Sequence, residues 1–348
     1  MSRVVLKQSY RDVEAFERAL QGVQGHYLQT KPAIREWRLC HADLDGTTLT
    51  LAQEGGPNLY QGACADDCFR ALVPLSRSNH LAVNGGLLMR TCVAWLAPAT
   101  EFSTRSAEAT RWLAISIARQ RVTRWLEQHS FDEVLAESDV AISADAGSIH
   151  HIVELMRRVL RVEAAGRAAL DSRAAEGALD QELTDTVLSV VGAHRSAMPV
   201  VGRGRPRLSR QIILKRIAGL IDESVDQPIR IGDFCRAARV SSRTLHAVFI
   251  EQFGMSAHRY LMLLRLRAIH SALLRAEPTE TVTDICARFG VWDHGRFAQN
   301  YRCHFGRLPS QVRSSQAAAE TRAKRRCARR RTGLDPRIEP GLVERLRR

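Results

Sequence analysis

Two stretches in the C-terminal half of the chain carry side chains that can bind the edges of nucleic-acid bases. These residues are Arg243, Thr244 and His246 in the first stretch, and His294, Arg296 and Gln299 in the second. Arginine can donate two hydrogen bonds to guanine, and glutamine can pair in the same two-point manner with adenine. On the outer face of a helix about 10 Å across, such side chains fit a major groove about 12 Å wide. The pattern predicts that these residues contact double-stranded DNA.

Not every such contact must read a base. Most hydrogen bonds between proteins and DNA go to the phosphate backbone, so a phosphate contact is nearly as well supported for each of the six residues. Arg265 and Arg302 lie in the same region and are candidate phosphate contacts. The alternative for these two arginines is a solvated surface position.

The two stretches are copies of one unit. Residues 231–254 align with residues 282–306 at an offset of 51, which becomes 52 after a turn. Each copy predicts a short helix, a tight turn and a longer helix that starts after Ser242 or Asp293 as N-cap and ends at a glycine C-cap. This is the anatomy of a helix-turn-helix. The alternative is a helical domain that merely contains an old duplication.

Residues 255–274 read as one stiff helix between the copies. Helices that enter successive major-groove segments on one face of B-DNA stand about 34 Å apart. A helix of about 20 residues is roughly 30 Å long. The spacing therefore predicts that both second helices can contact the same face of a duplex.

Residues 210–315 resemble the DNA-binding domain of the AraC/XylS family of bacterial transcription regulators. The resemblance covers both copies, the run RLRAIHSALL between them and the closing run FGRLPSQVR. The second copy, VTDICARFGVWDHGRFAQNYRCHFGRLPS, is similar in wording to the branch that includes ethanolamine-operon-type regulators, and residues 1–200 resemble that branch weakly. The resemblance implies an activator, less often a repressor, that binds promoter DNA and contacts RNA polymerase.

The family's base-reading positions fall on Arg243 and Ala247 in the first copy. In the second copy they fall on His294, Gly295 and Gln299. Ala247 and Gly295 depart from the family pattern, since alanine is short and glycine has no side chain. We expect the neighbouring polar residues of each helix to compensate.

The rest of the chain predicts an α+β protein. Short apolar runs separated by turns such as Asp45-Gly46 and Asn84-Gly85-Gly86 indicate antiparallel strands after a short helix. Amphipathic helices follow, one of them with Ser148 as a plausible N-cap. The expected organisation is a β-rich, cupin-like sensor domain (1–118), a helical dimerisation segment (119–197), a linker (198–209), an all-α double helix-turn-helix domain (210–315) and a basic disordered tail (316–348).

Charge is distributed unevenly along the chain. Residues 1–209 carry 24 Lys+Arg and 24 Asp+Glu, whereas residues 210–316 carry 16 and 9, and residues 317–348 carry 11 and 4. The net charge of +14 therefore lies in the C-terminal part. Such asymmetry favours a localised nucleic-acid contact, although a solvated basic surface would give the same count.

The N-terminal part suggests a small-molecule effector pocket. Trp95, Phe102 and Trp112 are candidate lining residues, and the alternative is that each is plain core. No motif identifies the effector. A homodimer through the helical segment follows from the usual plan of effector sensing with dimerisation.

Other chemistry finds weaker support. Cys64 and Cys68 form a single CxxxC without a second pair, so the eight cysteines favour free thiols over a metal site. We expect no cofactor, no metal and no enzymatic activity; the alternative is a β-barrel enzyme fused to a DNA-targeting module. The chain has no run of about 18 apolar residues and no signal-peptide pattern, which predicts a cytoplasmic protein. A membrane-surface binder using the arginine-rich tail is a further alternative.

Overall fold

The computed structural model describes residues 7–32, 36–44, 46–76, 81–129, 139–164, 173–197, 210–224, 228–277 and 279–314. The predicted linker 198–209, the predicted tail 316–348 and Asp45 of the predicted turn lie outside these residues. Two compact units are present. One comprises Met1–Val225 and Ile229–Leu263, and the other comprises Asp226–Pro228 and Leu264–Arg348.

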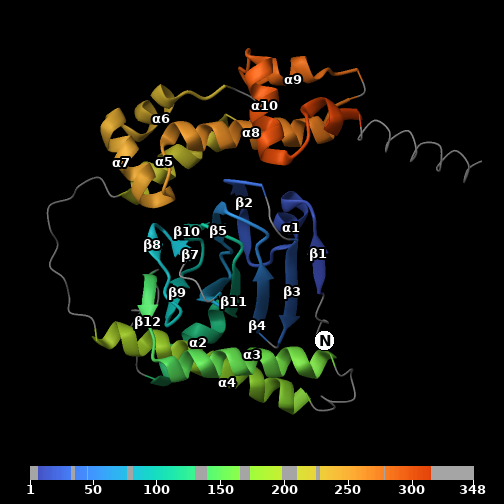
Figure 1. The fold of residues 1–348 in the computed structure, drawn as a ribbon. Coiled ribbons are helices and arrows are strands. Elements are labelled where there is room, and N and C mark those ends of the chain that lie inside the picture. The colour runs from blue at the N-terminus through green and yellow to red at the C-terminus, as the bar shows by residue number, and fades with distance from the viewer. Residues whose placement is uncertain are drawn as a thin grey trace, which may run out of the picture. The chain divides into compact units, whose positions relative to one another are not determined.

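The described strands form two antiparallel sheets (Figure 1). The seven-stranded sheet has the order β1 (Gln8–Tyr10), β3 (Trp37–Asp43), β4 (Thr47–Gln53), β11 (Arg111–Ala118), β6 (Cys68–Pro74), β9 (Cys92–Leu96) and β12 (Asp139–Ser143). The five-stranded sheet has the order β2 (Val23–Gln29), β5 (Asn58–Cys64), β10 (Glu101–Ser106), β7 (Leu81–Val83) and β8 (Gly86–Leu87). The mixed helix and sheet content agrees with the predicted α+β class.

The seven-stranded sheet is buried on both faces. Along β11, Trp112 and Ala114 belong to one apolar core, whereas Leu113, Ile115 and Ile117 belong to another. Successive side chains of a strand point to opposite faces, so a strand between two cores is apolar at nearly every position. The first core lies between the two sheets and the second lies between the seven-stranded sheet and helices.

The core between the sheets is rich in aromatic side chains. Helix α1 (Val13–Ala19), the predicted short helix, contributes Phe16, which is fully buried. The Phe16 ring lies 5.8 Å from Tyr27 and 5.0 Å from Trp37, measured between ring centroids. These contacts join α1 to one strand of each sheet.

Helices α2 (Arg119–His129), α3 (Ala146–Ala164) and α4 (Arg173–Ala197) cover the other face of the seven-stranded sheet. Helices α3 and α4 run side by side, and the predicted apolar stripes of both are buried in this core (Figure 1). Two details differ from the sequence prediction. Strand β12 interrupts the segment expected to be wholly helical, and Asp145, rather than Ser148, is the side chain that accepts the hydrogen bond of a first-turn amide, at 2.9 Å from the Ser148 nitrogen.

The C-terminal helices are α5 (Arg210–Glu223), α6 (Ile231–Ala238), α7 (Ser242–Phe253), α8 (Ala257–Arg275), α9 (Val282–Arg288) and α10 (His294–Phe305). Among the described residues, none of the helices has both the length and the apolar character that a bilayer span requires.

A buried carboxylate, Glu54, connects several strands in the interior of the compact unit that comprises Met1–Val225 and Ile229–Leu263. Its side chain accepts hydrogen bonds from Tyr27 Oη at 3.1 Å, Asn58 Nδ2 at 2.9 Å and Trp112 Nε1 at 2.8 Å. Burial raises the pKa of the Glu54 carboxyl above its ordinary value, although these hydrogen bonds lower it in part. The folded state therefore favours the protonated form, and its stability falls as pH rises from the ordinary pKa through the raised one.

Replacing Glu54 should separate its two effects. Glu54→Ala leaves the Tyr27 hydroxyl and the Trp112 indole N–H without an acceptor, at about 1–3 kcal/mol each, whereas Asn58 Nδ2 keeps the Gly56 carbonyl; we expect a loss of at least about 2 kcal/mol in the free energy of unfolding. Glu54→Gln keeps an acceptor but cannot ionise. In denaturant titrations from pH 4.5 upward, wild type should lose stability relative to Glu54→Gln. A constant difference between the two proteins across that range would contradict the buried titration.

Candidate nucleic-acid interface

The first repeated unit consists of α6 and α7. Helix α6 begins with a capping box in which the Arg230 nitrogen donates to Asp233 Oδ2 at 2.7 Å. It ends at Arg239, whose left-handed backbone (φ 55°) turns the chain toward the next helix. Helix α7 is capped by Ser241, whose Oγ accepts from the Thr244 nitrogen at 3.2 Å. The cap thus lies one residue before the predicted Ser242, and the predicted glycine C-cap is confirmed at Gly254.

The second unit, α9 and α10, repeats this plan. Thr281 and Asp284 form the capping box of α9. Asp293 caps α10 as predicted, accepting from the Arg296 nitrogen at 3.0 Å, and Gly306 ends the helix in the left-handed conformation. The starts of α6 and α9 differ by 51 residues, and those of α7 and α10 by 52. The structure therefore confirms the alignment of the two copies, including the extra residue before the second helix.

Each second helix is held by aromatic packing on its inner face. In the first unit, Phe249 and Phe253 of α7 each lie 5.2 Å from Tyr260 of α8, measured between ring centroids. In the second unit, the His270 ring stacks 4.2 Å from Phe305, and His270 Nδ1 lies 2.5 Å from the Tyr301 hydroxyl. These contacts fix which face of α7 and α10 remains outside.

The outer faces carry the side chains that the sequence singles out. All six predicted base-reading residues are exposed. Within the described residues, no hydrogen bond or ion pair engages the side chains of Arg243, His246, His294, Arg296 or Gln299. The Thr244 hydroxyl lies 3.0 Å from Ser241 Oγ. Five of the six polar side chains are therefore free to bind an external partner.

The two phosphate candidates differ. Arg302 of α10 is exposed, whereas Arg265 of α8 is half-buried. Trp292, which is not among the predicted contact residues, is 75 % exposed in the turn before α10. A large apolar side chain inside a polar turn is the signal that could have identified it. Its ring offers a flat surface beside the exposed residues of α10.

The C-terminal end of α7 contacts the five-stranded sheet, which belongs to the same compact unit. Gln252 is 8 % exposed, and its Nε2 donates to Ser103 Oγ of β10 at 2.9 Å. The hydroxyl of Tyr260 donates to Gln61 of β5, and Arg259 Nη2 donates to the Thr30 carbonyl at 3.2 Å. We call these hydrogen bonds the sheet contact. It uses the end of α7 opposite to Arg243, which stays exposed.

A narrow pocket lies between the five-stranded and the seven-stranded sheet. Predicted lining residues Phe102 and Trp112 border it, together with Tyr60 and Arg70. Trp95, the third predicted lining residue, does not. It lies on the opposite face of the seven-stranded sheet, where its ring stacks on Phe69 in the core under the helices.

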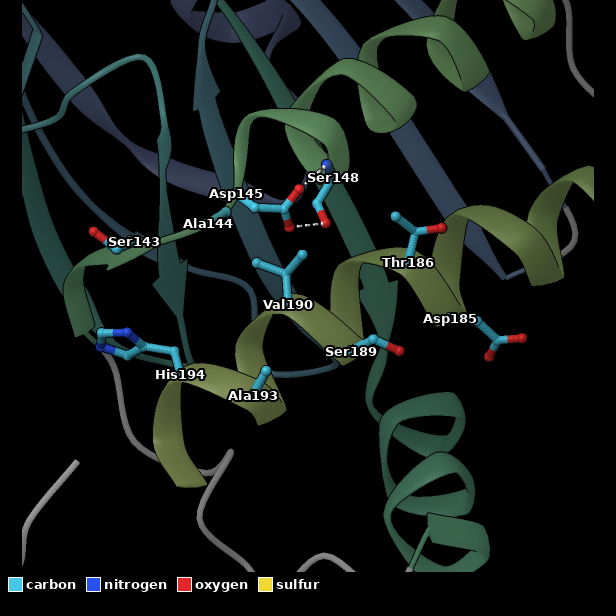
Figure 2. A pocket seen from close by; sticks show the side chains of 10 residues that line it. All are labelled: Ser143, Ala144, Asp145, Ser148, Asp185, Thr186, Ser189, Val190, Ala193 and His194. Carbon is cyan, nitrogen blue, oxygen red and sulfur yellow. Dashed lines mark hydrogen bonds between the residues drawn. The ribbon is translucent and has the colours of Figure 1, made fainter. Parts of the chain in front are cut away.

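A second hollow is open and polar. Figure 2 shows it between the start of α3, where Asp145 and Ser148 are hydrogen-bonded to each other, and the C-terminal part of α4 with Val190 and His194. Throughout the described ranges, no three His, Cys, Asp or Glu side chains gather closely enough to hold a metal ion. The seven cysteines in those ranges are free thiols.

Residues 234–315 match the family model described as a helix-turn-helix domain. The probable thc operon regulatory protein of Rhodococcus erythropolis is 33% identical over 100 residues, which are 28% of this chain and 30% of that relative. The XylDLEGF operon transcriptional activator 1 of Pseudomonas putida is 27% identical over 133 residues, or 37% and 38% of the two chains. This chain thus spans about a third of each of these curated relatives.

A crystal structure of the AraC-like transcriptional activator CuxR aligns with 77% of this chain and 96% of its own, at 8% identity and a TM-score of 0.41. The match to the family model and the curated relatives, and not this structural likeness, identify the C-terminal helices as a helix-turn-helix domain similar in sequence to those of AraC/XylS-type regulators.

The sheet contact makes a prediction about local stability. Gln252→Met keeps the size of the side chain but removes the donor to Ser103, a loss of about 1–1.5 kcal/mol. In hydrogen-exchange mass spectrometry, peptides within 249–262 should exchange roughly tenfold faster if they exchange through opening of this contact. The control is Glu251→Gln, which removes a surface ion pair with Arg210 and should leave this exchange unchanged. Equal hydrogen exchange in Gln252→Met and wild type would show that the hydrogen bond to Ser103 does not stabilise residues 249–262.

Proposed function

We propose that the protein is a DNA-binding transcription regulator of the AraC/XylS type that activates a promoter in response to a small-molecule effector. The observation that carries the proposal is the pair of equivalent helices, α7 and α10, whose unbonded polar side chains face outward. Five exposed, unpartnered polar side chains on two capped helices fit base and phosphate contacts in the major groove. The similarity to two operon regulators supports the same function.

Each part of the chain takes a role in this proposal. The β-rich part is a cupin-like sensor, and α3 with α4 supplies a homodimer contact. The DNA-bound form contacts RNA polymerase in the cytoplasm. The sequence of residues 282–310 supports the finer assignment to the ethanolamine-operon-type branch. Two such molecules on paired half-sites would couple effector binding to promoter binding through the geometry of the dimer.

The proposal treats the β-rich part as a sensor and not as a catalyst. Metal analysis of the purified protein distinguishes these roles, because a cupin-type enzyme would hold a metal ion in a fixed ratio to protein. A stoichiometric metal would favour the enzyme alternative.

DNA binding should depend steeply on salt. Each neutralised phosphate contributes a slope of about −0.9 to the plot of log association constant against log salt concentration. Fluorescence anisotropy of a labelled genomic duplex at several salt concentrations measures the slope. Arg302→Ala should reduce its magnitude by about 1 if Arg302 contacts a phosphate. Binding that is insensitive to salt would exclude the proposed contact.

Sequencing of genomic fragments captured by the protein tests the sequence-specific part. Arg243→Ala and Gln299→Ala should each weaken binding to the captured site by about 1–3 kcal/mol, or roughly ten- to a hundredfold. Each change should also relax the base preference at one position. The matched control is Arg11→Ala, an exposed arginine just before α1 that lies outside both the helix-turn-helix units and the proposed dimer contact. If that control weakens binding as much as Arg243→Ala, α7 does not read the site.

A further inference from the structure

The pocket between the two sheets contains a buried arginine without an acidic partner. Arg70 of β6 is 3 % exposed. Its Nη1 donates to the Gln21 carbonyl at 2.8 Å and to Ser116 Oγ at 3.2 Å, and no carboxylate in the described part of the chain pairs with it. A buried, unpaired charge costs several kcal/mol of stability. A protein that keeps such a charge in a pocket has a candidate anchor for an anion.

The acidic groups near Arg70 do not compensate its charge. They are the thiols of Cys64 and Cys68 and the phenols of Tyr60 and Tyr27. Burial raises the pKa of the Cys64 thiol to about 12, so this group is neutral at physiological pH. The buried carboxylate Glu54 accepts its hydrogen bonds from other residues and is not bound to Arg70. The positive charge of Arg70 is therefore left without a counter-charge.

A second polar group lines the same pocket without a partner. Tyr60 is 3 % exposed, and its hydroxyl has no hydrogen bond within the described residues. Gly25 and Gly62 make room for it, since a Cβ on either glycine would lie 2.7 or 2.6 Å from the Tyr60 oxygen. An unsatisfied buried hydroxyl costs about 1–3 kcal/mol, which a ligand atom would recover.

Most of the remaining lining is apolar. Leu72, Leu81 and Leu96 are buried deep in the pocket, and Leu20 and Val23 are half-buried at its rim. The side chains close on one another, leaving room for about one water molecule. A larger occupant must push the lining side chains apart.

We propose that this pocket binds an organic carboxylate with an apolar body, the carboxylate pairing with Arg70 and the body separating the apolar lining side chains. A carboxylate matches the planar fork of a guanidinium and supplies the missing negative charge. The Tyr60 hydroxyl is the second donor. This inference rests on the proposed function, because it names the chemical class of the effector.

The strands that line the pocket also form the sheet contact. Tyr60 and Thr104 are directly paired across β5 and β10 and border the pocket, whereas the next pair, Gln61 and Ser103, faces outward to α8 and α7. Because neighbouring residues of a strand point to opposite faces, any movement that opens the pocket also moves the residues that hold α7. The ligand is therefore read out at the first helix-turn-helix unit.

Isothermal titration calorimetry on the 348-residue chain without DNA tests the binding. The probes are phenylacetate, 3-phenylpropanoate and octanoate, each compared with its primary amide. At least one carboxylate should bind with a Kd below about 1 mM, and its amide at least roughly tenfold more weakly. Arg70→Met should weaken binding roughly ten- to a hundredfold, and Arg70→Lys should recover part of it.

Because Arg70→Met removes an internal hydrogen-bond donor, a second variant guards against misfolding. Val23→Trp changes a half-buried rim position and should block the pocket while Arg70 stays in place.

The bound carboxylate should alter hydrogen exchange in residues 249–262. Equal binding of acid and amide, unchanged binding by Arg70→Met or Val23→Trp, or no binding by any of the probes would overturn the proposal. DNA binding is measured in the same samples without probe. If the wild-type protein does not bind DNA, the result counts against the proposed function. If it binds DNA but the probe tests fail, the result counts against the pocket proposal alone.

Discussion

The fold of the C-terminal part depends on one constraint: each recognition helix must bury an aromatic face in order to expose a polar one. In α7, Phe249 and Phe253 pack on Tyr260, and in α10, Tyr301 and Phe305 pack on His270. Burial of an aromatic side chain contributes about 1.5–3 kcal/mol, far more than the exposed polar residues could contribute to folding. Arg243, His246, Arg296 and Gln299 are therefore not needed to hold the helices. They remain available for a partner because the inner face alone fixes the orientation.

The same separation of faces operates in the sheets. The seven-stranded sheet carries one core on each side, and the five-stranded sheet faces the pocket on one side and α7 on the other. Strand geometry therefore links the buried charge of Arg70 to the first helix-turn-helix unit through residues only one position apart. No long pathway of side chains is required. The pocket and the first helix-turn-helix unit therefore lie on opposite faces of a single sheet.

Much of this organisation could be predicted from the sequence, and the reasons for the failures are physical. The two copies, their offset and the caps at Asp293, Gly254 and Gly306 follow from local rules that hold without tertiary context. The face that a strand residue occupies does not follow in the same way. The run CVAWL around Trp95 is buried on both sides and shows no polar alternation, so the sequence does not reveal that Trp95 faces away from the pocket that Phe102 borders.

The sequence also did not reveal which groups pair with the buried polar residues. Arg70 stands in the run CFRALVP, where every neighbour is compatible with a buried strand, and Glu54 follows β4 directly. A charged residue inside an apolar strand is a signal of a buried charge. The partners of Arg70 are the Gln21 carbonyl and Ser116 of β11, and those of Glu54 come from β2, β5 and β11, so neither set can be inferred without the register. Strand β12 was missed for a related reason, since its pairing partner β9 is distant in sequence.

Hydroxyl-radical footprinting on a genomic duplex captured by the protein tests the central claim most directly. If α7 and α10 both enter the major groove, each protein molecule should protect two short patches about 10 base pairs apart on one face of the duplex. Arg243→Ala should weaken one patch and Gln299→Ala the other. A single patch per molecule, or two patches that respond together to both changes, would contradict the account of two independent recognition helices.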